Sequence, residues 1–513
     1  MTSLAPACGR TAMDVGHGLY PSVDAGAAAD ARLAMDALLP PDLAPAVGCA
    51  ALQPLANGVL TPRHAVRALF APDRTSLILR VRGEAPSESS VYDDLLLVQL
   101  PSGKVSTIIN SITSAEWLRP GSTLLVRAEQ EGRIDLVVVR PDGSGLRTLA
   151  QGVCDHVAAP DGTRVYAMRD CYSYRMGAMD VIDVVSGAIA RLAVGAQAGT
   201  AAVSPDGRWV AFLTSIPVDG GSSQNLVVVG GADGRVETLA SQPDAAQLGF
   251  VSDRLLLFRN GSSYINGDIR GHVPGTGDTS HLVAANRHPG WYGYRVSPDG
   301  TWLLGATEVT TFVAALYAIR LDGTGERLLA SDLYDFWRNQ LGPQVFAFTA
   351  SGRVIYKKDG DPAVATIGLD GSAPMEIAGP EWFLEAPRLN QVALVGPPET
   401  MAMTDRLQLA DSESGTAVFT YDSDGNVNTV GFPPDGRGLV FVESPTPGSH
   451  RLRYGSADKS VVLGEWQSSV FGWDSLSDAP PLHTYPIDPT GCFTVFDTDL
   501  APSPGTRLAI LPQ

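Results

Sequence analysis

The sequence predicts an all-β protein, a β-propeller of four-stranded blades. Three observations lead to this prediction. A Pro-Asp-Gly turn recurs along the chain, short apolar runs follow one another at regular spacing, and no helical period is found after the N-terminal segment. Gly contributes 54 and Pro 37 of the 513 residues, whereas only 18% are charged. Such a composition is typical of a chain made of many short strands and turns.

The recurrent turn is clearest in residues 203–212 and 296–305, which both begin with Val-Ser-Pro-Asp-Gly. Weaker copies occupy residues 159–166 and 433–441. In each copy Pro presets the turn, the Asp side chain caps it, and Gly supplies a positive φ. An apolar run precedes and follows the turn, so each copy predicts a β-hairpin.

These hairpins belong to units of about 40 to 50 residues, a period that indicates a propeller or a solenoid. Each unit contains four short apolar strands, with an Asp-Gly or Ser-Gly turn before the last one. The fifth and eighth units carry poor copies of the motif, and an irregular tenth runs to the C-terminus. The first nine units begin near His64, Trp117, Val153, Thr200, Gln247, Tyr294, Val345, Trp382 and Val427.

The Ser-Pro-Asp-Gly hairpin, followed by an apolar strand and an Asp-Gly turn, resembles the repeat of TolB-type, WD-repeat-like propellers. The resemblance covers nearly all of residues 64–463. It implies the fold and only loosely a function, because such propellers serve as binding scaffolds and as gating domains of peptidases. Ten units exceed the usual four to eight blades. One ring of 8–10 blades over residues 57–513 is preferred to two smaller rings with a break near residue 286, because no linker-like composition marks a boundary.

The N-terminal segment resembles the end of a bacterial lipoprotein signal peptide, in which small residues precede a Cys that becomes lipidated. Here that residue is Cys8, although Ala5 and Pro6 depart from the usual pattern and no apolar segment comes before them. Residues 1–50 are rich in Ala, Asp and Pro and are interpreted as a disordered tether. We expect a lipid-anchored protein of the bacterial periplasm or outer membrane, or a secreted one. The alternative is a disordered cytosolic leader.

Five cysteines leave one unpaired, which Cys8 as the lipidated residue accounts for. Cys154 and Cys171 flank the turn at residues 160–162 at nearly equal distances, so on an antiparallel hairpin they lie almost opposite each other. Cys49 and Cys492 lie near opposite ends of the folded region and are expected to join them. Both pairs suit an oxidising compartment, whereas the alternative is buried free thiols.

The charge of the chain restricts its partners. A net charge of -18 repels phosphate backbones and anionic lipid, so neither nucleic acid nor an anionic membrane surface is expected as a partner. No stretch of 18 apolar residues is found, and membrane contact is expected only through the lipid anchor. A monomer is expected.

Aromatic and basic residues gather in the segments that are expected to join one blade to the next. In a propeller these connections lie on one face, together with the loops between the second and third strands. Such a cluster makes a platform for a sugar ring, a peptide or a partner protein, whereas the alternative is packing between blades. The residues of this predicted loop face are Arg287, His288, Trp291, Tyr292, Tyr334, Phe336, Trp337, Arg338, Trp382 and Trp473.

Signatures of catalysis are missing from the sequence. It has no Gly-x-Ser-x-Gly elbow and no His-Glu-x-x-His pair, and neither a cofactor nor a metal is expected. Residues 422–428 alternate oxygen ligands as a calcium loop does but lack its later Glu, so an ordinary turn is preferred. We therefore expect a non-enzymatic scaffold that binds a protein or glycan. The rival hypotheses are a polysaccharide lyase or glycosidase acting in the propeller channel, and a purely structural module.

Overall fold

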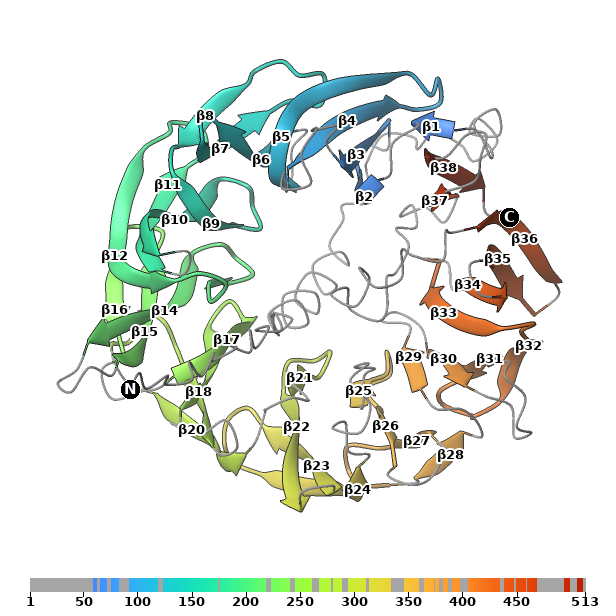
Figure 1. The fold of residues 1–513 in the computed structure, drawn as a ribbon. Coiled ribbons are helices and arrows are strands. Elements are labelled where there is room, and N and C mark those ends of the chain that lie inside the picture. Colours follow the sequence, from blue (N-terminus) through green and yellow to red (C-terminus); the bar gives the residue numbers. More distant parts are fainter. Residues whose placement is uncertain are drawn as a thin grey trace, which may run out of the picture.

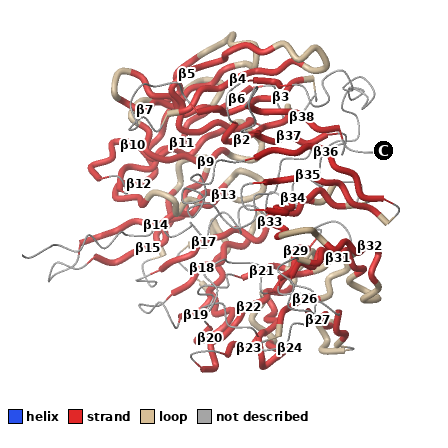
Figure 2. The backbone as a smooth tube through the Cα atoms, turned by 45° about the vertical axis from the view of Figure 1, so that its right-hand side comes forward, coloured by secondary structure: helices blue, strands red, loops and turns tan. Residues whose placement is uncertain are grey.

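The structure, a computed structural model, describes most of the chain between residues 59 and 510. The described ranges are 59–61, 65–71, 75–82, 92–118, 123–173, 176–217, 223–239, 245–260, 267–277, 280–287, 294–310, 313–333, 346–358, 364–372, 374–377, 382–385, 390–396, 405–433, 438–446, 449–457, 459–467, 493–498 and 505–510. Within them all regular structure is β-strand, and no helix is long and apolar enough to cross a membrane. Figure 2 shows strands and loops throughout these residues.

The strands form consecutive antiparallel units of four, which we number from the N-terminus. Units one and two share one seven-stranded sheet, because the long strand β5 ends the first unit and begins the second. Units three and four also join in one sheet, through the pairing of β12 with β14. The strands of these four units are β2 (Ala65–Phe70), β3 (Ser76–Arg82), β4 (Asp93–Gln99), β5 (Val105–Leu118), β6 (Thr123–Gln130), β7 (Arg133–Val139), β8 (Arg147–Ala150), β9 (Val153–Ala158), β10 (Arg164–Ser173), β11 (Met176–Asp183), β12 (Ile189–Gln197), β13 (Ala202–Val203), β14 (Trp209–Pro217), β15 (Ser223–Gly231) and β16 (Val236–Thr238).

Units five to nine are separate four-stranded sheets, in each of which the strands pair in chain order. Their strands are β17 (Ala245–Ser252), β18 (Leu255–Asn260), β19 (Gly267–His272), β20 (His281–Arg287), β21 (Tyr294–Val296), β22 (Trp302–Thr310), β23 (Val313–Arg320), β24 (Glu326–Leu333), β25 (Phe346–Phe348), β26 (Val354–Lys357), β27 (Val364–Ile367), β28 (Met375–Ile377), β29 (Trp382–Glu385), β30 (Gln391–Gly396), β31 (Arg406–Asp411), β32 (Ala417–Asp422), β33 (Asn426–Gly431), β34 (Leu439–Thr446), β35 (Ser449–Ser456) and β36 (Lys459–Gln467).

A last, three-stranded sheet combines the two ends of the described chain. Its strands β37 (Phe493–Thr498) and β38 (Gly505–Ile510) pair with each other, and β38 also pairs with β1 (Val59–Thr61). The units follow one another in chain order around a common axis, with β9, β17, β21, β25, β29 and β33 nearest to it (Figure 1). This is a propeller-type arrangement, as the repeats predict.

The units begin where the sequence places them. Apart from the second unit, whose first strand is the latter part of β5, each starts within two residues of its predicted position. Units five and eight, whose motifs are poor, are nevertheless complete four-stranded sheets. Units one and two, the second of which was expected to begin near Trp117, are continuous through β5. Within this strand Ser111 adopts a positive φ of 57°, and its N–H donates to Asp94 at 3.1 Å, which bends the strand while it continues.

The Pro-Asp-Gly turns have the geometry that their residues predict. In the fourth unit, Gly207 has a φ of 70° and donates to the Ser204 carbonyl at 2.8 Å, while Asp206 accepts from the N–H of Arg208 at 3.0 Å. The Ser204 hydroxyl accepts from the N–H of Trp209 at 3.0 Å. Unit six repeats the arrangement over residues 297–302. The copy at residues 434–437 lies outside the described residues.

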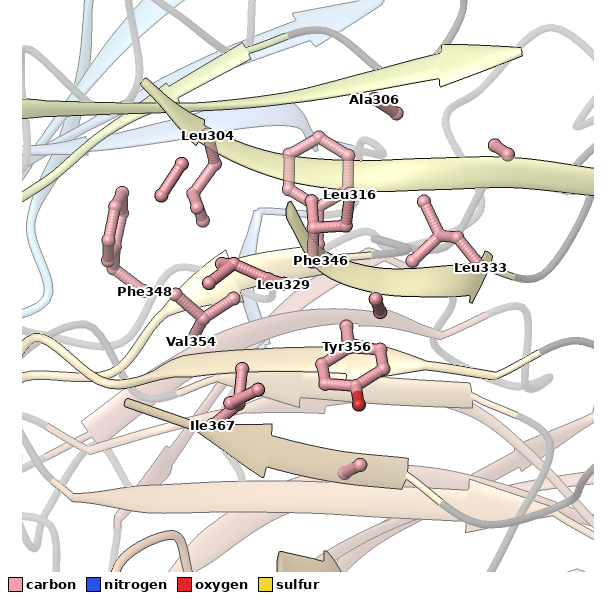
Figure 3. Packing of buried hydrophobic residues seen from close by; sticks show 14 residues of the cluster. Leu304, Ala306, Leu316, Leu329, Leu333, Phe346, Phe348, Val354, Tyr356 and Ile367 are labelled. Carbon is pink, nitrogen blue, oxygen red and sulfur yellow. The ribbon is translucent and has the colours of Figure 1, made fainter. Parts of the chain in front are cut away.

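The hydrophobic core lies between successive units. Figure 3 shows one such layer, in which side chains of β22, β23 and β24 meet those of β25, β26 and β27. Each buried Leu or Phe contributes about 1.5–3 kcal/mol. Because each sheet hides both faces against its neighbours, its central strands are almost continuously apolar, as in β7 and β30. The labelled residues of the layer are Leu304, Ala306, Leu316, Leu329, Leu333, Phe346, Phe348, Val354, Tyr356 and Ile367.

Candidate functional site

Each four-stranded unit has two ends that differ in their connections. At the turn end, short turns join the first strand to the second and the third to the fourth. At the crossover end lie the connections between the second and third strands and those that lead to the next unit. The predicted loop face corresponds to the crossover end.

Most of the predicted loop face lies outside the described residues. This applies to the connections between β20 and β21, between β24 and β25, and between β36 and β37. Arg287 is described as the last residue of β20, at the crossover end of unit five. The residues outside are His288, Trp291, Tyr292, Tyr334, Phe336, Trp337, Arg338 and Trp473, together with Cys8, Cys49 and Cys492.

The expectation that Trp382 lies in a connecting loop is wrong. Trp382 is the first residue of β29 and pairs with Val395 of β30. The strand begins there because aromatic residues favour extended backbone, and Phe383 and Leu384 continue the apolar run. Trp382 therefore belongs to the innermost strand of unit eight.

The turn ends of neighbouring units are joined by side chains at the start of the fourth strand. Arg147 of β8 donates to the carbonyl of Val184 in unit three, and Arg327 of β24 donates to that of Leu369 in unit seven at 2.8 Å. Further joints are Glu237 with His272, and His281 with the carbonyl of Leu321. In each case a residue at the turn end of one unit contacts a residue at the turn end of the next. These turn ends therefore lie on the same side of the molecule.

A buried polar group lies between units two and three, close to the innermost strands. His156 of β9 has Nε2 3.3 Å from Oε1 of Glu116 on β5, and its side chain is only 8% exposed. Burial lowers the pKa of Arg127 on β6, while the charge of Asp155 opposes that effect. Buried polar atoms of Ser114, Arg127 and His156 have no hydrogen-bond partner. Glu116, whose side chain is 27% exposed, and His156 thus contact each other within the joint, with the imidazole on its buried side.

Unit three holds a second polar group beside a disulfide bond. Cys154 of β9 and Cys171 of β10 are bonded, and their Cα atoms are 6.5 Å apart. Nearby, the buried carboxylate of Asp180 accepts from Arg169 at 2.7 Å and from Arg191 at 2.8 Å. The hydrogen bonds that Arg191 donates to Asp180 and Asp170 raise the pKa of Arg191. The two arginines thus neutralise Asp180 across three adjacent strands, which makes this group a structural clamp.

Glu443 of β34 is the centre of the third polar group. Its side chain is completely buried and accepts from Arg453 Nε at 2.5 Å, from the Tyr421 hydroxyl at 2.8 Å and from the Ser423 hydroxyl at 3.0 Å. The Arg453 guanidinium also lies over the Tyr421 ring, 5.1 Å from its centroid. Burial alone would raise the pKa of Glu443, but these hydrogen bonds hold that pKa below its ordinary value. Tyr421 and Ser423 come from unit eight and the connection after it, so the group ties units eight and nine together.

The same region shows what the calcium-like stretch does. Asp422 pairs with Arg406 at 2.7 Å, and Asp424 pairs with Arg451 at 3.3 Å. Both carboxylates are thus engaged by arginines, Arg406 of β31 and Arg451 of β35. Among the residues that the structure describes, no group of three or more His, Cys, Asp or Glu side chains could hold a metal ion.

Sequence reasoning missed all three polar groups, together with the joints between turn ends. Their members are far apart along the chain, as Tyr421 and Glu443 are, and no fixed spacing connects them. A usable signal is a charged residue within an otherwise apolar strand. Asp180 in Met-Gly-Ala-Met-Asp-Val and Glu443 in Leu-Val-Phe-Val-Glu both fit this description.

Comparison with known proteins gives the chain no family. No family model matches it, and no curated protein matches it either. Solved structures that it resembles include a eukaryotic initiation factor, with 12% identity over 73% of this chain and 93% of the other, at a TM-score of 0.47. Prolyl endopeptidase resembles it at 14% identity over 93% of this chain and 57% of the other, with a TM-score of 0.39. TolB from Acinetobacter baumannii does so at 13% over 55% and 75%, with a TM-score of 0.26.

Proposed function

We propose that the protein is a non-enzymatic binding scaffold of the bacterial cell envelope that takes a protein or glycan partner at its crossover end. The observation that carries the proposal is the difference between the two ends of the units. Side chains join neighbouring turn ends at several places, so part of that end is engaged in contacts between the units. A partner is therefore expected at the other end.

The connections at the crossover end vary in length from one unit to the next. Unit two ends at Ala150 and unit three begins at Val153, whereas unit six ends at Leu333 and unit seven begins at Phe346. Long connections on a rigid scaffold are where binding residues concentrate. Five aromatic residues of the loop face, Trp291, Tyr292, Tyr334, Phe336 and Trp337, belong to two successive connections, 288–293 and 334–345, which supports one shared platform.

The test compares partner recovery by two double variants of the full chain. Trp291→Ala/Trp337→Ala removes the aromatic residues of the platform. The matched control, Leu146→Ala/Val185→Ala, removes exposed apolar side chains at the turn end, where Leu146 is 54% and Val185 84% exposed. We expect the first variant to lose partners from an envelope fraction and the control to keep them. Equal recovery by both would refute the platform.

The chemical class of the partner is settled by treating the envelope fraction before capture. Digestion with a protease removes a protein partner, while digestion of the polysaccharide removes a glycan partner. We expect only one of the two treatments to abolish capture by the wild type. Capture that survives both would contradict a protein or glycan partner.

We also propose that the units close one ring of ten blades, in which the three-stranded sheet is the tenth. This sheet supports the proposal because it contacts β36 of the last unit and β2 of the first, and because it pairs the N-terminal β1 with the C-terminal β38. A closed ring leaves only short, protected sheet edges. Class averages of single particles viewed along the axis test it. We expect ten radial densities, and two separate smaller rings would refute it.

The envelope location is proposed from Cys8 and from the disulfide. A disulfide between Cys154 and Cys171 supports a compartment where thiols are oxidised. If Cys8 carries a lipid, Cys8→Ser should release the protein from the membrane fraction without changing its fold. Unchanged partitioning of the variant would refute the anchor.

A further inference from the structure

The joints between turn ends use two kinds of chemistry. At the joints of units two with three and six with seven, the donor is an arginine, Arg147 or Arg327, at the first or second position of the fourth strand. Arginine keeps its charge at every pH at which proteins are folded. These two joints therefore do not respond to pH through the donor.

Unit five is joined on both sides through a histidine instead. His281 is the first residue of β20, the strand position of Arg147, and its Nε2 lies 3.3 Å from the carbonyl oxygen of Leu321 in unit six. His272 is the last residue of β19, and its Nε2 lies 3.0 Å from Oε2 of Glu237 in unit four.

The two imidazoles lie on opposite faces of one sheet and on adjacent strands. Gly271 pairs with His281, while His272 pairs with Leu256 of β18. A Cβ atom on Gly271 would lie 2.5 Å from Cε1 of His281, so the His281 ring rests on the backbone next to His272. His272 is completely buried, whereas His281 is exposed. A change at one ring therefore reaches the strand that carries the other.

Of the carboxylates near these rings, Glu237 contacts an imidazole directly, that of His272. Asp268 and Asp322 each lie near an arginine. Within unit five, Arg270 lies 3.9 Å from Asp268. On the turn that His281 contacts, Arg320 lies 4.0 Å from Asp322. The ionisable groups on the described elements packed around the two rings include Glu237 of β16, Arg259 of β18, Asp268 and Arg270 of β19, Tyr317 and Arg320 of β23 and Asp322 of the turn after it.

We propose that unit five is a pH-responsive part of the propeller, whose contacts with units four and six strengthen when His272 and His281 become protonated. Histidine is the side chain that ordinarily changes its charge between about pH 5 and 8. An imidazolium donates a charge-assisted hydrogen bond, which is roughly twice as strong as a neutral one. Both joints are thus strongest in mild acid and weaken as the pH rises.

Strand β20 connects the joint at His281 with the predicted loop face at the opposite end of the unit. Strand β20, which begins with His281, ends with Arg287 and leads into the connection that contains Trp291. A unit five that is held on both sides keeps the two ends of this connection, Arg287 and Tyr294, at a fixed separation. We therefore expect partner affinity to rise in mild acid, and this expectation rests on the proposed function. The pH response of the contacts around unit five does not rest on it.

Hydrogen–deuterium exchange of the full chain tests the proposal between pH 5.5 and 8, with rates corrected for the intrinsic pH dependence. We expect protection of the β17–β20 peptides, relative to those of unit seven, to fall several-fold as the pH rises. His272→Gln/His281→Gln should abolish this pH dependence, while the matched control His156→Gln, at the joint of units two and three, should keep it. Wild-type protection that does not change with pH, or the same change in the double variant, would overturn the proposal.

A second variant guards against misfolding of the first. His281→Arg introduces the donor that Arg147 and Arg327 provide, and should keep β20 protected at pH 8 as it is at pH 5.5. Loss of protection at pH 8 in this variant, as large as in the wild type, would also overturn the proposal. Partner capture is measured in parallel at both pH values. If no partner is captured but hydrogen exchange responds to pH as expected, the result counts against the proposed function and not against the pH response of unit five.

Discussion

Glu443→Gln is the sharpest test of how the units hold together. The carboxylate is completely buried and accepts hydrogen bonds from Arg453, Tyr421 and Ser423. The amide of Gln has nearly the same volume, so the substitution removes the charge and one acceptor without leaving a cavity. The side chain of Arg453 is only 14% exposed, so little water replaces its lost partner.

Leaving one member of a buried ion pair without its partner costs about 3–5 kcal/mol. Arg453 retains its contact with the Tyr421 ring and a 3.5 Å hydrogen bond to Ser460, which places the expected loss near the lower figure, about 3 kcal/mol. The matched control is Asp422→Asn. It breaks the pair with Arg406 in which both side chains are well exposed, 45% and 71%, and should cost less than about 1 kcal/mol.

Urea unfolding followed by tryptophan fluorescence measures both variants, and the pH dependence adds a second check. Because hydrogen bonds hold the pKa of Glu443 below its ordinary value, its contribution is present above the pKa of an unfolded Glu. It is lost as the pH falls through the lower folded pKa. The difference between wild type and Gln variant should therefore shrink below about pH 4. A Gln variant no less stable than the Asn control, or a difference that ignores pH, would refute the reasoning.

Two further predictions concern covalent and backbone constraints. Cys171→Ser opens the disulfide to Cys154, which spans 17 residues, and should lower the free energy of unfolding by about 3 kcal/mol; a reductant should then affect the wild type but not the variant. Gly323→Ala should cost more than about 2 kcal/mol in thermal unfolding, since Gly323 has a φ of 75° and a Cβ there would lie 2.7 Å from the Leu282 carbonyl. The control Gly300→Ala, with a φ of 68° in open space, should cost about 1 kcal/mol, and equal losses would contradict the steric argument.

The local parts of the fold could be predicted from the sequence because their causes are local. Asp206 accepts from a backbone N–H two residues away, and Gly207 supplies the positive φ within the same turn. Strands between such turns are apolar and short, so their limits follow from the residues themselves. Unit five forms a complete sheet although its turn motif is poor, because its apolar strands pair in register without that motif.

The contacts between units could not be predicted in this way. The sequence suggested an ordinary turn rather than a calcium loop at Asp422 and Asp424, but it did not show that arginines of β31 and β35 engage both carboxylates. Which arginine faces which carboxylate depends on strand register and on the packing of one sheet against the next. Trp382 was expected both at the start of unit eight and in a connecting loop, and the pairing with Val395 decides for the strand.

The turn chemistry repeats along the chain while the joint chemistry does not. Ser204 and Ser297 make nearly identical hydrogen bonds in units four and six. The joints instead use Arg147 after unit two, but a histidine on either side of unit five. In a repeat protein, stability is approximately a sum of terms for the units and for the interfaces between them. Since the units share one design, differences in local opening must come chiefly from the joints, and unit five is where a change of pH alters two neighbouring joints at once.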